Sequence, residues 1–233
     1  MPSIYLIPSF IAENATNTIP TYIIHSVRNC QVIFAENERT ARRFLKSIDA
    51  SIIIDDFEWH TIHKSESQQI SHFKDAVRSN KNIAIISEAG CPGVADPGQE
   101  LIAVAQEMDC TIKPLVGPSS ILLALMASGM NGQQFEFIGY LPIDNSERIK
   151  KIKELELQSA KNNSTKIFIE TPYRNNQLFE CLLQNCNPTT KLCVGKNITS
   201  QEEFIVTKRI KEWKQHKPEL HKIPTIFLLH AGS

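Results

Sequence analysis

The sequence lacks several features that would assign it to a membrane or secreted class. No apolar run approaches the roughly 20 residues that a membrane-spanning helix requires, and no basic segment followed by a signal-like apolar core stands at the N-terminus. Neither sign of charge is in excess, because 25 lysines and arginines balance 25 aspartates and glutamates. This balance gives no overall attraction to nucleic acid or to an anionic membrane, although a local basic patch stays open. We therefore expect a cytoplasmic protein without a membrane segment.

The cysteines and histidines show no metal-binding pattern. No Cys-x-x-Cys pair occurs, and without a secretion signal we expect reduced thiols rather than disulfides or a structural zinc site. His60, His63 and His72 form the only histidine cluster, and their spacing fits no metal template, so we expect solvated or capping roles. The prediction is a protein without a metal. The six cysteines are Cys30, Cys91, Cys110, Cys181, Cys186 and Cys193.

A dinucleotide fingerprint is also missing, since no Gly-x-Gly-x-x-Gly follows the first predicted strand. The 233 residues, 42% of them hydrophobic, suffice for one large domain or two small ones. In the first half, apolar runs alternate with helical patterns, which predicts a parallel sheet covered on both faces. One of these helices is predicted to begin at Ser65, with Gln68 in capping-box register. The predicted strands are residues 4–7, 31–35, 52–54, 83–86 and 111–116.

The second half has a different texture. Its predicted strands lie closer together with fewer helices between them, which indicates a mixed, partly antiparallel sheet. We place the boundary between Cys110 and Gly117, which gives an N-terminal α/β domain of residues 1–113 and a C-terminal mixed α/β domain of residues 114–233. No long linker separates the halves, so we expect an interface of the kind that ligand sites favour. The predicted strands are residues 135–141, 165–170, 191–194, 203–207 and 224–230, and the predicted helices are residues 147–158 and 177–183.

Residues 87–98 are the strongest candidate for a binding loop. Three glycines and two prolines occur in these twelve residues, directly after the apolar run 83–86 and before a helical pattern. Such a loop at the carboxyl end of a buried strand is where open α/β sheets bind ligands, and an ordinary tight turn is the alternative. Asp96 is predicted to cap the following helix, with Pro97 in its first position and Gln99 in capping-box register.

A second punctuated junction, Gly117-Pro118-Ser119-Ser120, opens a predicted helix over residues 121–127. Free backbone N–H groups and two hydroxyls at this helix start suit a polar or anionic group. A well-made helix N-terminus without a ligand is the alternative.

Together these stretches resemble the tetrapyrrole (corrin/porphyrin) methylase superfamily. More narrowly, the chain is similar to the branch that methylates a ribose 2′-hydroxyl of small-subunit ribosomal RNA. That branch has an Ala-Glu-Asp-Thr-Arg-like stretch, a Ser-Asp-Ala-Gly-Thr-Pro loop, a Pro-Gly-Pro-Ser junction and a Tyr-Glu-Ser-Pro-His-Arg stretch. The corresponding segments follow in the same order here and are residues 35–40, 87–98, 116–120, 127–129, 137–142 and 169–174.

The resemblance implies two α/β domains, a homodimer, and S-adenosylmethionine bound in the cleft between the halves. Carried over by position, the cofactor contacts come from the first loop, the two punctuated junctions and the C-terminal half. The implied cofactor-binding residues are Pro8, Ile11, Gly90, Cys91, Val94, Ser119, Ser120, Glu170 and Ile198.

The chain departs from the branch at several of its motif positions. Residues 10–14 read Phe-Ile-Ala-Glu-Asn where the branch has Pro-Ile-Gly-Asn, so Ala12 replaces a glycine. Glu88 stands in place of Asp, Cys91 in place of Thr, and Asn37 in place of Asp. Cofactor binding survives such changes more easily than RNA specificity does.

Three functions stay open at this point. The methyl acceptor is a ribose of small-subunit ribosomal RNA, or it is a tetrapyrrole precursor; alternatively, the altered first loop leaves a catalytically impaired dimeric binding protein. A ribose hydroxyl gains from a nearby base, and the sequence singles out none. The candidate carboxylates are Glu36, Glu38, Glu88 and Glu170. The arginines that an RNA phosphate would meet, or that are solvated on helix surfaces, are Arg39, Arg42, Arg43 and Arg174.

Overall fold

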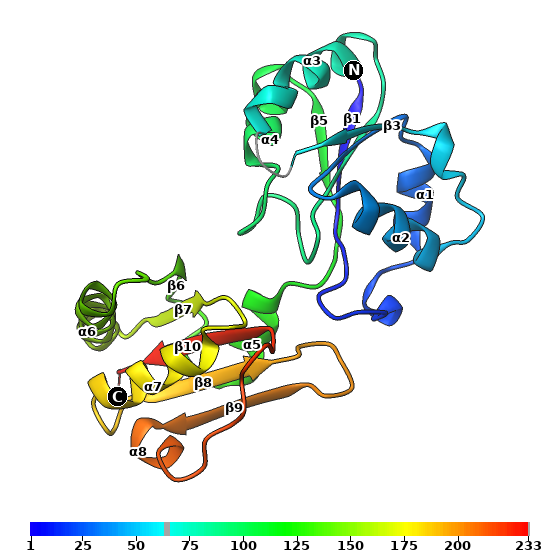
Figure 1. Ribbon diagram of the computed structural model, residues 1–233. Helices are drawn as coiled ribbons and strands as arrows, with labels where there is room; N and C mark the ends of the chain where they lie inside the picture. Colours follow the sequence, from blue (N-terminus) through cyan, green and yellow to red (C-terminus); the bar gives the residue numbers. More distant parts are fainter. Residues whose placement is uncertain (63–65, 233) are drawn as a thin grey trace. The chain divides into compact units, whose positions relative to one another are not determined.

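The computed structural model describes residues 1–62 and 66–232 of the chain. Two compact units make up this structure, Met1–Ser119 and Ser120–Ser233 (Figure 1). Each unit has its own five-stranded sheet. The division into domains 1–113 and 114–233 stays a prediction, and the units below are those of the structure.

The first unit contains a fully parallel sheet. Its strand order is β3-β2-β4-β1-β5, and every neighbouring pair runs in the same direction. All four residues of β2 and of β4 are buried, as expected for inner strands of a parallel sheet that is covered on both faces. The predicted parallel sheet is thus confirmed. The strands are β1 (Ser3–Ile7), β2 (Val32–Ala35), β3 (Glu58–Thr61), β4 (Ile83–Ile86) and β5 (Thr111–Pro114).

Helices cover both faces of this sheet (Figure 1). Helices α1 and α2 bury apolar side chains in one cluster with strand residues such as Ile33 and Ala84. Helices α3 and α4 pack in a second cluster with the alternate strand residues, such as Ile83 and Ile85. The helices are α1 (Tyr22–Arg28), α2 (Glu38–Ile48), α3 (Ile70–Arg78) and α4 (Gln99–Glu107), and the short 3-10 helices are η1 (Thr16–Thr18), η2 (Ile54–Asp56) and η3 (Glu66–Gln69).

The strand predicted at residues 52–54 is wrong. The third strand of the unit is β3, which is polar and lies at the edge of the sheet, where β2 is its one partner among the described residues. Ile52 is buried in the helix-side cluster, whereas Ile53 is 62% exposed and Ile54 begins a 3-10 turn. Of the apolar run at residues 52–54, Ile52 is thus the buried side chain that anchors this segment to the core. The predicted helix start at Ser65 lies outside the described residues.

The predicted cap of α4 is also wrong. The helix begins at Gln99, and its cap residue is Gly98, whose φ of 122° only glycine adopts readily. Because glycine has no side chain, the cap residue itself cannot accept a hydrogen bond from the first turn of the helix. Instead, the Glu66 carboxylate accepts from the backbone N–H of Gly98 at 3.0 Å and of Leu101 at 2.8 Å. A carboxylate at this position satisfies free N–H groups and interacts favourably with the helix dipole.

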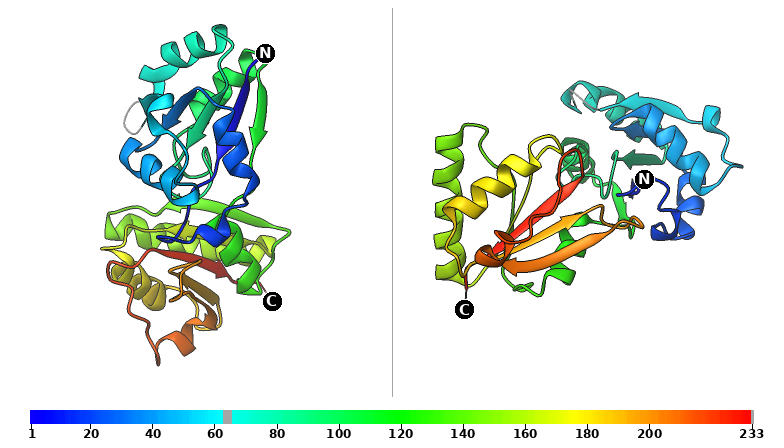
Figure 2. Two further views of the ribbon diagram at one scale, coloured as in Figure 1. Left: turned by 90° about the vertical axis from the view of Figure 1, so that its right-hand side faces the viewer. Right: turned by 60° about the horizontal axis from the view of Figure 1, so that its bottom comes forward.

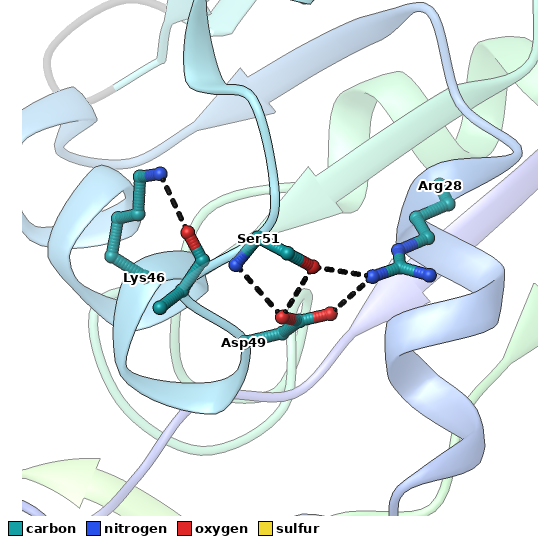
Figure 3. A network of polar contacts seen from close by, with 5 residues as sticks. Arg28, Lys46, Asp49 and Ser51 are labelled. Atoms are coloured by element: carbon teal, nitrogen blue, oxygen red, sulfur yellow. Dashed lines mark hydrogen bonds and ion pairs between the residues drawn. The ribbon is translucent and has the colours of Figure 1, made fainter.

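A polar network at the carboxyl ends of α1 and α2 ties these two helices together (Figure 3). The Arg28 guanidinium donates to Asp49 Oδ2 and, at 2.7 Å, to Ser51 Oγ. Hydrogen bonds from Ser51 lower the pKa of Asp49, with a smaller contribution from the Arg28 charge. The Lys46 side chain points toward the segment 49–51 and donates to the Ala50 carbonyl at 2.9 Å.

The second unit has a mixed sheet of order β6-β7-β10-β8-β9. Strands β6 and β7 are parallel, whereas the other neighbouring pairs are antiparallel, which confirms the predicted mixed sheet. Helices α6, α7 and α8 pack on one face and α5 on the other (Figure 2). The elements are α5 (Ser120–Ser128), β6 (Phe135–Tyr140), α6 (Asn145–Asn162), β7 (Thr165–Ile169), α7 (Asn175–Asn185), β8 (Lys191–Lys196), β9 (Phe204–Arg209), α8 (Ile210–Trp213) and β10 (Thr225–His230).

Among the helices of residues 1–62 and 66–232, none combines the length and the apolar character needed to cross a bilayer. In the same described ranges, histidine, cysteine and acidic side chains do not gather in groups of three that could hold a metal ion.

Candidate functional site

Three loops meet at the carboxyl edge of the first sheet. They follow β1, β4 and β5, which are neighbours in the strand order, so the parallel topology delivers all three loops to one end of the sheet. This edge is where open α/β sheets bind their ligands. The loops are residues 8–15, 87–98 and 115–119.

An isolated antiparallel bridge joins the first loop to the second. The Ser9 N–H donates to the Gly90 carbonyl at 2.8 Å, and the Gly90 N–H donates back at 3.3 Å. The Ser9 hydroxyl also donates to the Ser87 carbonyl at 2.8 Å. Gly90 has a φ of 73°, which glycine adopts without strain. This φ turns the main chain sharply at Gly90, in the conformation that pairs with Ser9.

The third loop lies directly against the other two. Gly117 packs on the Pro8 ring so closely that a methyl group added at Gly117 would overlap with Pro8 Cβ and Cγ. The Pro118 carbonyl oxygen lies 3.6 Å from Cys91 Sγ. Gly117, Pro8 and Pro118 therefore allow the loops to pack closely, so that three main-chain segments lie within contact distance.

The second loop carries backbone strain and a high-pKa carboxyl group. Ala95 has a φ of 65°, a conformation that costs free energy for a residue with a Cβ. Burial raises the pKa of Asp96 to about 7, and the negative charges of Glu36 and Glu88 add to the shift. Burial and the Asp96 charge also raise the pKa of the Cys91 thiol, so this group stays protonated near neutral pH.

The acidic neighbours are held by hydrogen bonds to other elements. Glu36, at the end of β2, accepts from the Glu88 N–H at 2.8 Å. Thr40, in the first turn of α2, donates its hydroxyl to Glu88 Oε1 at 3.0 Å. Helix α2 is itself fixed at its start because Asn37 accepts from the Thr40 N–H. The predicted stretch 35–40 and the loop 87–98 are thus brought together.

A cavity of about 330 Å³ opens between the first loop and α2. Ile11 and Ala12 line it from the loop, Thr40 and Arg43 from the helix, and Glu88 from the second loop. Its volume lies at the lower end of the range found for small-molecule sites.

Six of the nine predicted cofactor-binding residues lie in these three loops. Pro8 is buried under Gly117, Ile11 lines the cavity, and Val94 is 50% exposed. Gly90, Cys91 and Ser119 complete the set within the first unit.

The other three predicted residues belong to the second unit. Ser120 is the first residue of α5. Ile198 is only 4% exposed and packs in the apolar cluster around α5. Glu170 is 5% exposed; its Oε1 accepts from the Thr171 N–H at 2.6 Å and from Arg174 Nη2 at 2.7 Å. In the described part of the chain, Glu170 Oε2 has no hydrogen-bond partner, which is unusual for a buried carboxylate oxygen.

Sequence reasoning missed several residues that shape this region. Ser9 holds the loop bridge, Phe10 and Phe44 line the cavity, and Glu66 caps α4. Their interactions join segments that are distant along the chain, so no local sequence pattern marks these residues.

The fold defined by these two units is that of known methyltransferases. The methyltransferase CobJ superposes with a TM-score of 0.66 at 16% identity, covering 99% of this chain and 94% of that one. Uroporphyrin-III C-methyl transferase from Thermus thermophilus, complexed with S-adenyl homocysteine, gives a TM-score of 0.60 at 14% identity and covers 98% and 97%. At these identities the likeness concerns the fold alone.

The chain belongs to the tetrapyrrole (corrin/porphyrin) methylases, because the model of that family matches residues 23–214. "Ribosomal RNA small subunit methyltransferase I" from Bacillus subtilis (strain 168) is 30% identical over 206 residues, 88% of this chain and 67% of that protein. The protein of the same name from Micromonospora olivasterospora is 28% identical over 90% of this chain, which spans 64% of that relative's length. The fold and the family resemblance predicted from the sequence are confirmed.

Proposed function

We propose that the protein transfers a methyl group from S-adenosylmethionine to a ribose 2′-hydroxyl of small-subunit ribosomal RNA. The main support is the convergence at one sheet edge of three loops that each contain proline, two of which also contain glycine. Relatives named for ribosomal RNA small subunit methylation match the chain over most of its length and favour RNA as the acceptor.

The loop residues suit the proposed cofactor. A nucleoside with an amino-acid tail needs several main-chain segments close together. Gly90 provides this proximity through its bridge to Ser9, and Gly117 provides it through its packing on Pro8. Pro8, Ile11, Cys91, Val94 and Ser119 would add apolar and hydroxyl contacts from the same loops. Ser120, Glu170 and Ile198 stay predicted contacts from the second unit; the unpaired Glu170 Oε2 supports a polar partner there.

The bound cofactor supplies an electrophilic methyl group on a sulfonium. The protein's own task is to hold the acceptor oxygen in line with that methyl group and to exclude water. A ribose hydroxyl gains from proton removal, and a group with a pKa near the working pH does this best. Asp96, with a pKa of about 7, is the carboxyl group of the second loop that meets this requirement.

Assembly and location belong to the same proposal. The family resemblance implies a homodimer, and a ribosomal RNA acceptor supports a location in the cytoplasm. Sedimentation equilibrium of the purified chain measures the oligomeric state directly. A mass twice that of the 26.3 kDa chain is expected.

Calorimetry with S-adenosylhomocysteine tests the cofactor site. Gly90→Ala is expected to weaken binding, because it disturbs the loop bridge. Gly129→Ala is the matched control, since Gly129 has a similar positive φ of 67° but no atom within 4 Å of an added Cβ. If the unaltered chain gives no heat of binding, the protein does not bind the cofactor, and the alternative of a catalytically impaired binding protein replaces the proposed methyltransferase.

Methyl transfer tests the acceptor. Labelled S-adenosylmethionine is incubated with the protein and ribosomal RNA from a strain that lacks it, and a labelled ribose is expected in the small-subunit RNA. The absence of label, together with a coloured ligand that copurifies, would favour a tetrapyrrole acceptor instead.

A further inference from the structure

The cavity between the first loop and α2 has walls of three chemical kinds. Phe10 and Phe44 supply an aromatic wall and stand edge to face, with ring centroids 5.0 Å apart. Phe44 is almost fully buried, whereas Phe10 is half-buried, so Phe10 is the ring with surface left for a ligand. Aromatic faces stack on nucleic-acid bases with little sequence preference.

Arg43 provides the positive charge of the cavity. It is exposed on α2, and within residues 1–62 and 66–232 no carboxylate or carbonyl is recorded as its partner. The guanidinium of the neighbouring residue, Arg42, already has partners, since it forms an ion pair with Glu38 and lies over the Trp59 ring. A guanidinium available in this way suits a phosphate group, which it binds through two parallel hydrogen bonds.

Two carboxylates line the same cavity and narrow the choice of ligand. Glu13 comes from the first loop and Glu88 from the second, where Glu88 already accepts from the Thr40 hydroxyl at 3.0 Å. A purely anionic ligand would be repelled by these groups. A ligand that combines a phosphate, a planar ring and hydroxyl donors satisfies all three walls at once, and a nucleotide has this composition.

We infer that this cavity binds a nucleotide of the acceptor RNA, with its phosphate on Arg43, its base against Phe10 and its hydroxyls toward Thr40 and Glu88. The inference rests on the proposed function and names the residues that would select RNA. The position of the cavity supports it, because two cavity-lining residues belong to the proposed cofactor loops: Ser9 forms the bridge to Gly90, and Ala89 precedes Gly90 in the chain.

Filter binding of labelled small-subunit ribosomal RNA tests the inference on the full chain saturated with S-adenosylhomocysteine. Arg43→Ala is expected to weaken RNA binding roughly tenfold, as one charge-assisted contact is lost. The slope of log Kd against log salt should fall by about 1. Lys46→Ala removes the same charge one turn along α2, at a residue that does not line the cavity, and should change neither quantity. Lys46 instead donates to the Ala50 carbonyl (Figure 3).

Phe10→Leu separates stacking from charge. It keeps apolar packing against Phe44 but removes the ring, so RNA binding should weaken about tenfold while the salt slope is unchanged. Calorimetry with S-adenosylhomocysteine should give the same Kd for all variants.

The outcomes distinguish this inference from the function on which it rests. If RNA binds the unaltered protein and Arg43→Ala behaves like Lys46→Ala, the nucleotide pocket is wrong and the methyltransferase proposal stands. If Arg43→Ala weakens S-adenosylhomocysteine instead, the cavity belongs to the cofactor and the inference is overturned. If RNA does not bind the unaltered protein although S-adenosylhomocysteine does, both the RNA acceptor and this pocket are refuted.

Discussion

Replacing Gly117 by alanine should separate the loops at the carboxyl edge of the first sheet. The added methyl carbon would approach Pro8 Cβ and Cγ to well under 3.0 Å and lie 3.6 Å from Pro8 Cα. Non-bonded carbons rest about 3.5–4.0 Å apart, so the two segments would have to move apart by about 1 Å. The proline ring cannot rotate away, and the following residue, Ser9, is fixed by its bridge to Gly90.

The size of the effect follows from this rigidity. Overpacking a well-packed site costs about 1–3 kcal/mol, and we expect about 2 kcal/mol here because the obstructing atoms belong to a ring next to the backbone. For a chain of this length, such a loss lowers Tm by about 4–8 °C. Gly117 itself has no positive φ, so the loss would be purely steric.

Urea and thermal denaturation measure the loss, with Gly132→Ala as the matched control. Gly132 also lacks a positive φ, and an added Cβ there meets no atom within 4 Å, so its substitution should change stability by less than about 1 kcal/mol. S-adenosylhomocysteine should bind Gly117→Ala more weakly than it binds Gly132→Ala. Equal stability and equal affinity of the two variants would refute the close approach of Gly117 and Pro8.

Three further predictions concern carboxylates. Glu66→Ala should lower the unfolding free energy by about 1–2 kcal/mol because α4 loses its cap, whereas Glu100→Ala in the exposed first turn of that helix should have little effect in the same urea titration. Asp96 holds its proton up to about pH 7 in the folded state but only to about 3.8 when unfolded, so the stability that it contributes falls as pH rises between these values. Asp96→Asn should therefore be more stable than the unaltered protein at pH 8, by about 1 kcal/mol after solvent screening, and a denaturation series in which the two proteins lose stability equally from pH 5 to 8 would contradict this. Glu170→Gln should cost about 1–3 kcal/mol by thermal denaturation, because the buried carboxylate loses its charge pair with Arg174; a neutral result would show that the pair is dispensable.

The sequence predicted the parts of the fold whose signal is local. Strand β4 is buried on both faces, so four consecutive apolar residues marked it, and the loop after it was visible through its glycines and prolines. Strand β3 could not be found in this way, because an edge strand of sequence Glu-Trp-His-Thr carries no apolar run. The nearby run of three isoleucines at 52–54 was therefore predicted as the strand instead.

Site residues show the same division. The second and third loops were predicted from their own composition and the first loop from the family resemblance, but the contacts among the loops depend on strand order, which brings β4, β1 and β5 together. The cap of α4 comes from Glu66, more than thirty residues upstream, so no capping-box rule applies. The raised pKa of Asp96 likewise depends on burial in the folded chain and then on the charge of Glu36, at the end of a different strand.

The way the loops are joined has a thermodynamic consequence for the proposed cofactor. The sheet strands are paired along their length, whereas the three loops are joined by a few separate contacts. The first two loops share an isolated bridge and the hydrogen bond from the Ser9 hydroxyl to the Ser87 carbonyl. The third loop is held by the packing of Gly117 on Pro8 and by the contact of its Pro118 carbonyl with Cys91 Sγ. Segments with so few mutual contacts open at a lower free energy than the sheet. A ligand that contacts all of them binds only the closed arrangement, and at 100 times its Kd it would stabilise the native state by about 2.7 kcal/mol. S-adenosylhomocysteine should therefore raise the Tm of the unaltered protein more than that of Gly117→Ala, since the variant must first close the loops against the added methyl group.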